Sequence, residues 1–248
     1  MINISGHRFL GLPVAKPRVW IDLSSAKSKR AGLAMHTPGR KALQWAVKVL
    51  GAFTWLPIEK IIRGPIKRFD ELDGHEVIEK AVGESIEYLT LYMGNDSAKS
   101  KLTVLVSTVD RAKHGRRGRL IVKLGKTPKA ANAIRNEVLI LTRLMATPIC
   151  AQVPLIRGDV GADGSWTWSA QSVLPKGKSP AHLQSEHFAF LEELRKVNVS
   201  HGDFAPWNCS IVDGKLYVWD WEDAGPWVEG KDEAWFKGQV KKLLGIDA

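Results

Sequence analysis

The chain has 248 residues, is 44% hydrophobic and carries a formal net charge of +10, so it can bury one or two cores without disulfide or metal support. Its two cysteines, Cys150 and Cys209, exclude a disulfide framework and favour a reducing compartment. The longest uncharged run, 144–156, has thirteen residues and two prolines, which is too short for a membrane span. Because residues 1–14 do not resemble a signal peptide, the sequence predicts a cytoplasmic protein.

The excess positive charge is confined to the beginning of the chain. Residues 1–70 hold thirteen Lys and Arg against three Asp and Glu, whereas residues 71–248 hold twenty-three of each. We interpret residues 1–83 as a basic, partly helical N-terminal extension. Within it, the pattern of residues 40–56 predicts a basic amphipathic helix, which is typical of segments that lie on an anionic membrane surface. The alternative is a helix packed on the protein with its charges solvated.

Five runs of β-forming residues follow, and they predict five strands. They are residues 87–93, 102–108, 118–124, 153–157 and 166–173. The third run contains a lysine, Lys123, among apolar residues, and a buried lysine requires a partner. The next segment, 130–144, has helical character and contains one acidic residue, Glu137. Glu137 is therefore the natural partner of Lys123, although an edge-strand lysine and a solvated glutamate would produce the same pattern.

The most informative motif lies near the end of the chain, where His201-Gly202-Asp203 is followed by Asn208 and then by Asp220-Trp221-Glu222. Between Asn208 and Asp220, two short β-runs flank an Asp-Gly pair, which predicts a tight hairpin. That hairpin returns the chain so that Asp220 can lie near Asn208. The alternative is a hairpin with a polar loop and no chemistry.

This motif resembles the Brenner motif of the aminoglycoside phosphotransferase and choline kinase group. The resemblance implies an α+β, protein-kinase-like two-lobe fold, with an antiparallel five-stranded N-lobe at 84–175 and a small helical C-lobe at 176–248. It also implies an ATP-dependent phosphotransferase with an alcohol group as acceptor. Asp203, with His201, would be catalytic, and Asn208 and Asp220 would bind Mg²⁺.

The same resemblance implies a nucleotide-binding set upstream. In kinases, a strand lysine holds the phosphates and pairs with a glutamate of the next helix, so the roles fall on Lys123 and Glu137. Val173 and Leu174 would form the hinge that meets the adenine base. Gly94 and Ser97 belong to the loop that would cover the phosphates, although an ordinary hairpin loop explains that segment equally well.

The sequence departs from the family where the acceptor pocket is usually built. Between hinge and catalytic loop there is space for only one helix, at about 180–195, and after Asp220 there is space for only one more, at about 232–244. Four local segments resemble phosphotransferase-type proteins of bacterial polysaccharide and lipopolysaccharide assembly: 101–104, 179–183, 201–208 and 220–222. We therefore expect a small-molecule or glycan hydroxyl as acceptor. The alternative is a catalytically silent kinase-fold protein that binds a nucleotide or an anion. Because the chain has no helix-turn-helix, zinc-finger or RNA-binding signature, nucleic acid is not an expected partner.

Overall fold

The structure is a computed structural model. It describes residues 4, 6–13, 15–35, 41–83, 85–93, 101–110 and 116–244. The chain divides into two compact units, and the expected α+β class is confirmed. The first unit comprises Met1–Ala131 and Gly161–Ala170, and the second comprises Asn132–Val160 and Gln171–Ala248.

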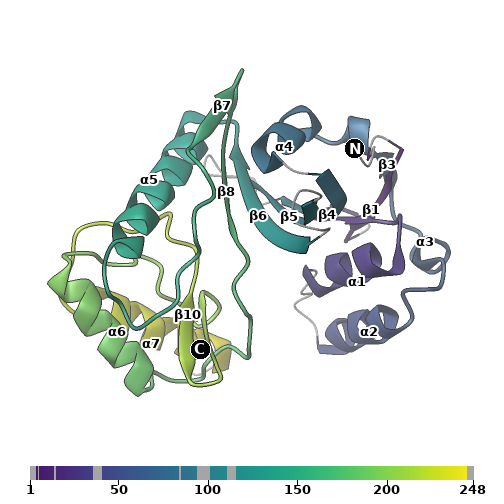
Figure 1. The fold of residues 1–248 in the computed structure, drawn as a ribbon. Coiled ribbons are helices and arrows are strands. Elements are labelled where there is room, and N and C mark those ends of the chain that lie inside the picture. Colours follow the sequence, from purple (N-terminus) through teal and green to yellow (C-terminus); the bar gives the residue numbers. More distant parts are fainter. Residues whose placement is uncertain are drawn as a thin grey trace. The chain divides into compact units, whose positions relative to one another are not determined.

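The first unit contains an eight-stranded sheet in the order β3-β1-β2-β4-β5-β6-β8-β7 (Figure 1). Every pairing whose register is resolved is antiparallel. The strands are β1 (Arg8–Leu12), β2 (Val19–Asp22), β3 (Ile66–Arg68), β4 (Ser85–Met93), β5 (Lys101–Asp110), β6 (Arg116–Gly125), β7 (Gly161–Asp163) and β8 (Trp166–Ser172).

The predicted number of five strands is wrong, because the basic N-terminal segment contributes three. Its strands β1, β2 and β3 are only three to five residues long, so they have too few residues for a clear alternating pattern. Strand β2 pairs with β4 through Val19 opposite Tyr92 and Ile21 opposite Thr90. The predicted strand at 153–157 is also wrong, since that segment makes only the isolated bridge from Ile156 to Gln171.

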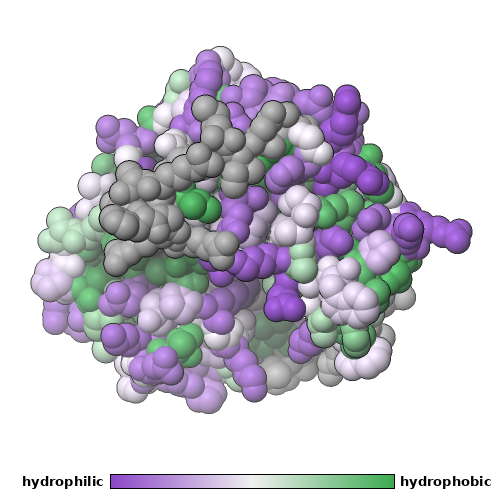
Figure 2. Space-filling model, turned by 45° about the vertical axis from the view of Figure 1, so that its right-hand side comes forward, coloured by the Kyte–Doolittle hydropathy of each residue, from purple (hydrophilic) through white to green (hydrophobic). Residues whose placement is uncertain are grey.

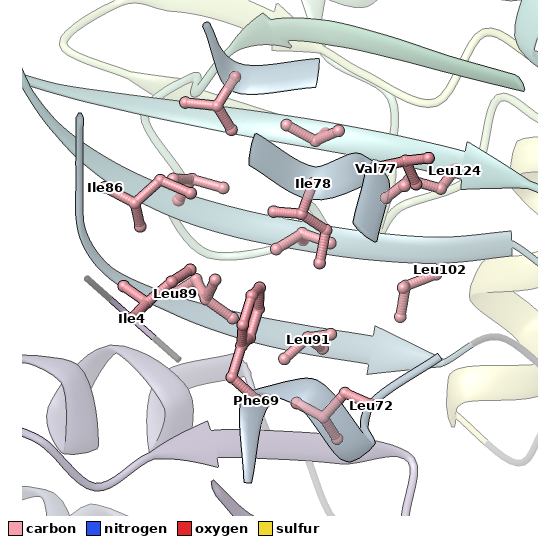
Figure 3. Packing of buried hydrophobic residues seen from close by; sticks show 14 of the residues in the cluster. Ile4, Phe69, Leu72, Val77, Ile78, Ile86, Leu89, Leu91, Leu102 and Leu124 are labelled. Carbon is pink, nitrogen blue, oxygen red and sulfur yellow. The ribbon is translucent and has the colours of Figure 1, made fainter. Parts of the chain in front are cut away.

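One face of the sheet packs against helix α4 (His75–Val82) and the short helix η1 (Phe69–Glu71). Alternate residues of each strand point to the same face, so Leu89 and Leu91 of β4 meet Val77 and Ile78 of α4 in one apolar cluster (Figure 3). The cluster fixes β4 and β5, the strands on either side of residues 94–100.

At strands β1 and β2 the other face of the sheet packs against helices of the basic segment, α1 (Ala26–Met35), α2 (Lys41–Ala52) and α3 (Ile58–Ile61). The helix predicted at 40–56 is present, but it ends at Ala52. Helix α1 approaches β2 closely because Gly32 has no side chain: a Cβ atom there would lie 2.6 Å from the side chain of Ile21. Val47 and Leu50 of α2 pack against this second cluster.

The second unit contains three longer helices and a two-stranded hairpin. They are α5 (Pro128–Met145), whose first turn belongs to the first unit, α6 (Ser185–Lys196), α7 (Lys231–Leu244), β9 (Cys209–Val212) and β10 (Lys215–Val218). Helices α5 and α7 agree with the predicted ones, whereas α6 begins at Ser185, five residues later than predicted. Phe190, Phe204, Trp221 and Phe236 are completely buried in the core of this unit. Within the described residues, no helix combines the length and the apolar character needed to cross a bilayer.

Candidate functional site

The predicted hairpin after Asn208 is confirmed. Strands β9 and β10 pair with Val212 opposite Lys215, which leaves a two-residue turn of Asp213 (φ 50°) and Gly214 (φ 71°), the backbone that an Asp-Gly hairpin turn adopts. Beyond the two strands, the N–H of Trp219 donates to the carbonyl of Asn208 at 3.0 Å. A backbone hydrogen bond therefore joins Trp219, the residue before Asp220, to Asn208.

The Asp203 carboxylate accepts a hydrogen bond at each of its two oxygens. The amide Nδ2 of Asn208 donates to Oδ2 at 2.9 Å and also to the Asp203 carbonyl at 2.9 Å. The indole Nε1 of Trp235, on α7, donates to Oδ1 at 2.7 Å. Each carboxylate oxygen keeps a second lone pair, so the half-buried carboxylate is oriented and can still accept a proton.

His201 is completely buried, and both of its ring nitrogens have partners. Nε2 lies 3.1 Å from the carbonyl of Trp219, which can only accept, whereas Nδ1 accepts the backbone N–H of Asp203 at 3.3 Å. These two bonds require a neutral ring protonated at Nε2. Burial lowers the pKa of His201 and outweighs the nearby carboxylates of Asp232, Asp220 and Asp203, which act to raise it. The ring therefore connects the loop that carries Asp203 to the strand end that carries Asp220.

Asp232, at the start of α7, fixes the backbone of the same loop. Its buried carboxylate accepts the N–H of His201 at Oδ2 (2.7 Å) and the N–H of Gly202 at Oδ1 (2.9 Å). Gly202 has φ +85°, and a Cβ atom there would lie 2.0 Å from the carbonyl oxygen of Asp223. Only glycine fits at this position, which explains the middle residue of the His-Gly-Asp motif.

The segment around Asp220 is held by helix α5. Asn136 donates from Nδ2 to the carbonyls of Glu222 (3.0 Å) and Ala224 (2.9 Å). The buried Glu137 accepts the N–H of Trp221 at Oε1 (3.2 Å). Asp220 itself has φ +69°, a conformation that costs a non-glycine residue about 1–2 kcal/mol. Such strain persists only where the surroundings fix the backbone.

The donor set suits a magnesium ion. Both N–H groups of the Asn208 amide face oxygens of Asp203, so its Oδ1 is directed away from Asp203. Together with the Asp220 carboxylate this provides hard oxygen ligands with a single carboxylate, a combination that Mg²⁺ accepts when phosphate oxygens and waters complete the octahedron. The described residues contain no cluster of three or more His, Cys, Asp or Glu able to hold a metal, which separates this set from sites built entirely of protein ligands.

Lys123 lies on β6, where it is 6% exposed. Because β6 lies between β5 and β8 in the sheet, the interpretation of Lys123 as an edge-strand lysine is wrong. Lys123 belongs to the first unit and Glu137 to the second, and the ion pair between them stays a prediction.

The other predicted nucleotide-binding residues lie in two places. Val173 and Leu174 follow β8 directly and are half-buried. Gly94 and Ser97 lie outside the described residues. The roles of all four stay predictions.

Sequence reasoning missed two contributors to this site, Asp232 and Trp235. Of the tryptophans after residue 206, Trp221 is fully buried in the core, whereas Trp207 is 40% and Trp235 is 44% exposed. The sequence placed Trp235 one helical turn after Asp232, on a helix with no assigned role. That spacing puts both side chains on one face of α7, but it does not show which part of the protein this face meets.

No protein-family model matches the sequence, and no curated protein sequence matches it. The chain is similar to solved structures of small-molecule kinases. The complex of APH(2″)-IIa with streptomycin and ATP shares 15% identity over 71% of this chain and 84% of that chain, with a TM-score of 0.47. Amicoumacin kinase hAmiN, in complex with AMP-PNP, Ca²⁺ and Ami, shares 14% identity over 69% and 70% of the two chains, with a TM-score of 0.48.

A third match is WbdD, described as a bifunctional kinase-methyltransferase. It shares 14% identity over 64% of this chain, with a TM-score of 0.42, and the match spans only 37% of WbdD. At such identities and TM-scores, the similarity assigns no role to any residue of this chain.

Proposed function

We propose that this protein is an ATP-dependent phosphotransferase that moves the γ-phosphate to a hydroxyl of a small molecule or glycan. The observation that carries the proposal is the Asp203 carboxylate, oriented by Asn208 and Trp235 in a loop whose backbone is fixed by Asp232. Phosphoryl transfer needs a group that positions the attacking hydroxyl and accepts its proton. A carboxylate held by two side-chain donors meets that need.

In the proposed reaction, the acceptor hydroxyl donates a hydrogen bond to the Asp203 carboxylate. The hydroxyl oxygen then bonds to the γ-phosphorus while the bond from that phosphorus to the bridging oxygen of ADP breaks. ADP leaves with the electron pair, and the hydroxyl proton passes to Asp203. His201 does not exchange protons, because both ring nitrogens are bonded within the protein. We therefore assign it a positioning role in place of the catalytic one that the motif suggested.

We assign Asn208 and Asp220 to Mg²⁺, which when bound supplies positive charge that stabilises the triphosphate. Asn208 would contribute its amide oxygen, since its nitrogen is bonded to Asp203. Asp220 would contribute its carboxylate from a backbone held by Asn136 and Glu137. Lys123, paired with Glu137, would bind the phosphates, with Val173 and Leu174 at the base and Gly94 and Ser97 in the covering loop.

The decisive experiment is a phosphotransfer assay with γ-labelled ATP and Mg²⁺ against sugar, aminoglycoside and lipid-linked glycan acceptors. We expect the Asp203→Ala protein to lose about 10²–10⁴-fold in turnover and to keep its affinity for Mg·ATP. Asp159→Ala, which removes an exposed carboxylate outside the loop, is the matched control and should be fully active. Wild-type turnover by Asp203→Ala would refute the assignment. Binding of Mg·ATP without turnover on any acceptor would favour the alternative of a silent nucleotide-binding protein.

A further inference from the structure

Four large apolar side chains are exposed within seventeen residues of the basic N-terminal segment. They are Trp45 on α2, Phe53 and Trp55 in the turn that follows it, and Ile61 at the end of α3. Trp45 is 69% and Trp55 is 71% exposed. We call these four residues the aromatic surface. Figure 2 shows hydrophobic side chains lying among hydrophilic ones on the face that it presents.

The aromatic surface is separate from the part of the same segment that packs on the sheet. Val47, Leu50 and the fully buried Ile58 belong to the apolar cluster between these helices and strands β1 and β2. One side of the segment is therefore already buried against the sheet, and the four exposed side chains are not needed for that packing. Scattered exposed apolar residues are ordinary, but a group of four that includes two tryptophans is typical of an interaction site.

The stretch of sequence that carries this surface is strongly basic. Residues 23–68 contain ten Lys and Arg and a single acidic residue, Glu59. On helix α1, Lys29 Nζ donates to the carbonyl of Leu56 and Arg30 Nε to the carbonyl of Gly51, each at 3.3 Å. These two bonds bring cationic groups to both ends of the turn that carries Phe53 and Trp55.

We propose that the aromatic surface and its surrounding lysines and arginines bind the surface of an anionic lipid bilayer. Tryptophan is enriched at the membrane interface, where its ring lies at headgroup level. Each Lys or Arg near an anionic bilayer adds about 1 kcal/mol of attraction. Binding to nucleic acid would use the same charges, but the exposed Ile61 favours lipid, because an aliphatic side chain neither neutralises a phosphate nor stacks on a base. This inference does not depend on the proposed catalysis.

Deletion of residues 1–70 is an unsuitable test because it would remove β1, β2 and β3 from the sheet. Point variants of the full chain avoid this. We would measure co-sedimentation with phosphatidylglycerol–phosphatidylcholine vesicles and with phosphatidylcholine vesicles. The wild-type protein should bind the anionic vesicles and be released as salt rises, since screening acts within about 8 Å at physiological ionic strength.

Two variants separate the two contributions. The variant Lys48→Glu/Lys60→Glu/Arg63→Glu should bind anionic vesicles about 100-fold more weakly. The variant Trp45→Ser/Trp55→Ser should bind roughly 10-fold more weakly and should lose the quenching of tryptophan fluorescence by brominated lipid. All five side chains are at least partly solvent-exposed, so neither variant disturbs a core.

Matched controls come from the second unit. Leu139→Ser/Leu155→Ser removes two exposed apolar side chains, and Lys196→Glu/Lys215→Glu/Lys241→Glu reverses three exposed charges. Both should bind like the wild type. Equal binding to neutral vesicles, or full binding by the Trp45/Trp55 variant, would overturn the proposal. Tighter binding to duplex DNA than to anionic vesicles, unchanged in that variant, would replace lipid by nucleic acid.

Discussion

The indole Nε1 of Trp235 donates a 2.7 Å hydrogen bond to Oδ1 of Asp203, although the two residues are thirty-two positions apart in the chain. Of the two donors to this carboxylate, Trp235 comes from outside the His-Gly-Asp loop, whereas Asn208 lies within it. Helix α7 thus contributes both to the loop backbone, through Asp232, and to the carboxylate itself, through Trp235.

We expect Trp235→Phe to lower kcat about tenfold with little effect on stability. The substitution keeps the ring and removes the donor, and a hydrogen bond to a charged group contributes about 1.5–3 kcal/mol. Trp227→Phe is the matched control, because the Trp227 indole donates to the exposed Glu229. Steady-state phosphotransfer kinetics check this. Equal rates for the two variants would show that Trp235 does not orient Asp203.

Replacing Gly202 by alanine should disrupt the loop, because the added Cβ would lie 2.0 Å from the Asp223 carbonyl oxygen. Gly214→Ala provides the comparison: Gly214 also has a positive φ, but a Cβ there meets nothing within 4 Å. We expect Gly214→Ala to cost only about 1–2 kcal/mol of backbone strain and Gly202→Ala clearly more. Urea unfolding of both proteins measures this, and equal losses would contradict the close approach.

Asp232→Ala should lower the free energy of unfolding by about 2–5 kcal/mol. It would leave the N–H groups of His201 and Gly202 without acceptors in a buried place, and each such group costs about 1–3 kcal/mol. Glu233→Ala, in the same helical turn, breaks only an exposed ion pair with Lys237 and should cost no more than about 1 kcal/mol. The prediction fails if denaturant midpoints of the two variants coincide.

Asp220→Ala and Lys123→Ala should weaken nucleotide binding, because we assign both residues to the phosphates and their metal. Saturation of the wild type at 100 times the dissociation constant stabilises it by about 2.7 kcal/mol, so Mg·ATP should raise its melting temperature clearly. The two variants should show much smaller shifts. Lys126→Ala, which loses an exposed ion pair to Asp73, should shift like the wild type. Similar shifts in all four proteins would contradict the roles.

Two buried histidines should make the protein less stable below neutral pH. Burial lowers the pKa of both His187 and His201, so below the unfolded value of about 6.5 the unfolded chain binds protons that the native state does not. The free energy of unfolding therefore decreases as the pH is lowered, by up to about 1.4 kcal/mol per pH unit for each histidine. Urea unfolding at pH 7.5 and 5.5 should show a smaller difference for His187→Gln than for the wild type. His182→Gln, at an exposed position, should narrow the difference much less, because the charge of His182 is a smaller cause of the lowered His187 pKa than burial is.

Strong local patterns in the sequence predicted the helices α2, α5, α6 and α7, the strands of the middle of the sheet and the hairpin. Asp213-Gly214 fixes its own turn, and the apolar run around Lys123 is long enough to specify a strand. The short strands of the N-terminal segment were missed because a run as short as Val19–Asp22 shows no clear pattern by itself. It forms a strand because it pairs with β4. The sequence identified Asp203 and Asn208, but not Asp232 and Trp235, since nothing local shows that α7 returns to the loop.

The two outer strands of the sheet, β3 and β7, are each three residues long, and between them they carry Lys67, Arg68 and Asp163. Short, charged outer strands present few unpaired backbone groups to another chain. By contrast, β4 has nine residues and an apolar face, and without β1 and β2 it would become an outer strand. The basic segment therefore protects the protein against strand-to-strand aggregation. A protein that lacked this segment would have poor solubility.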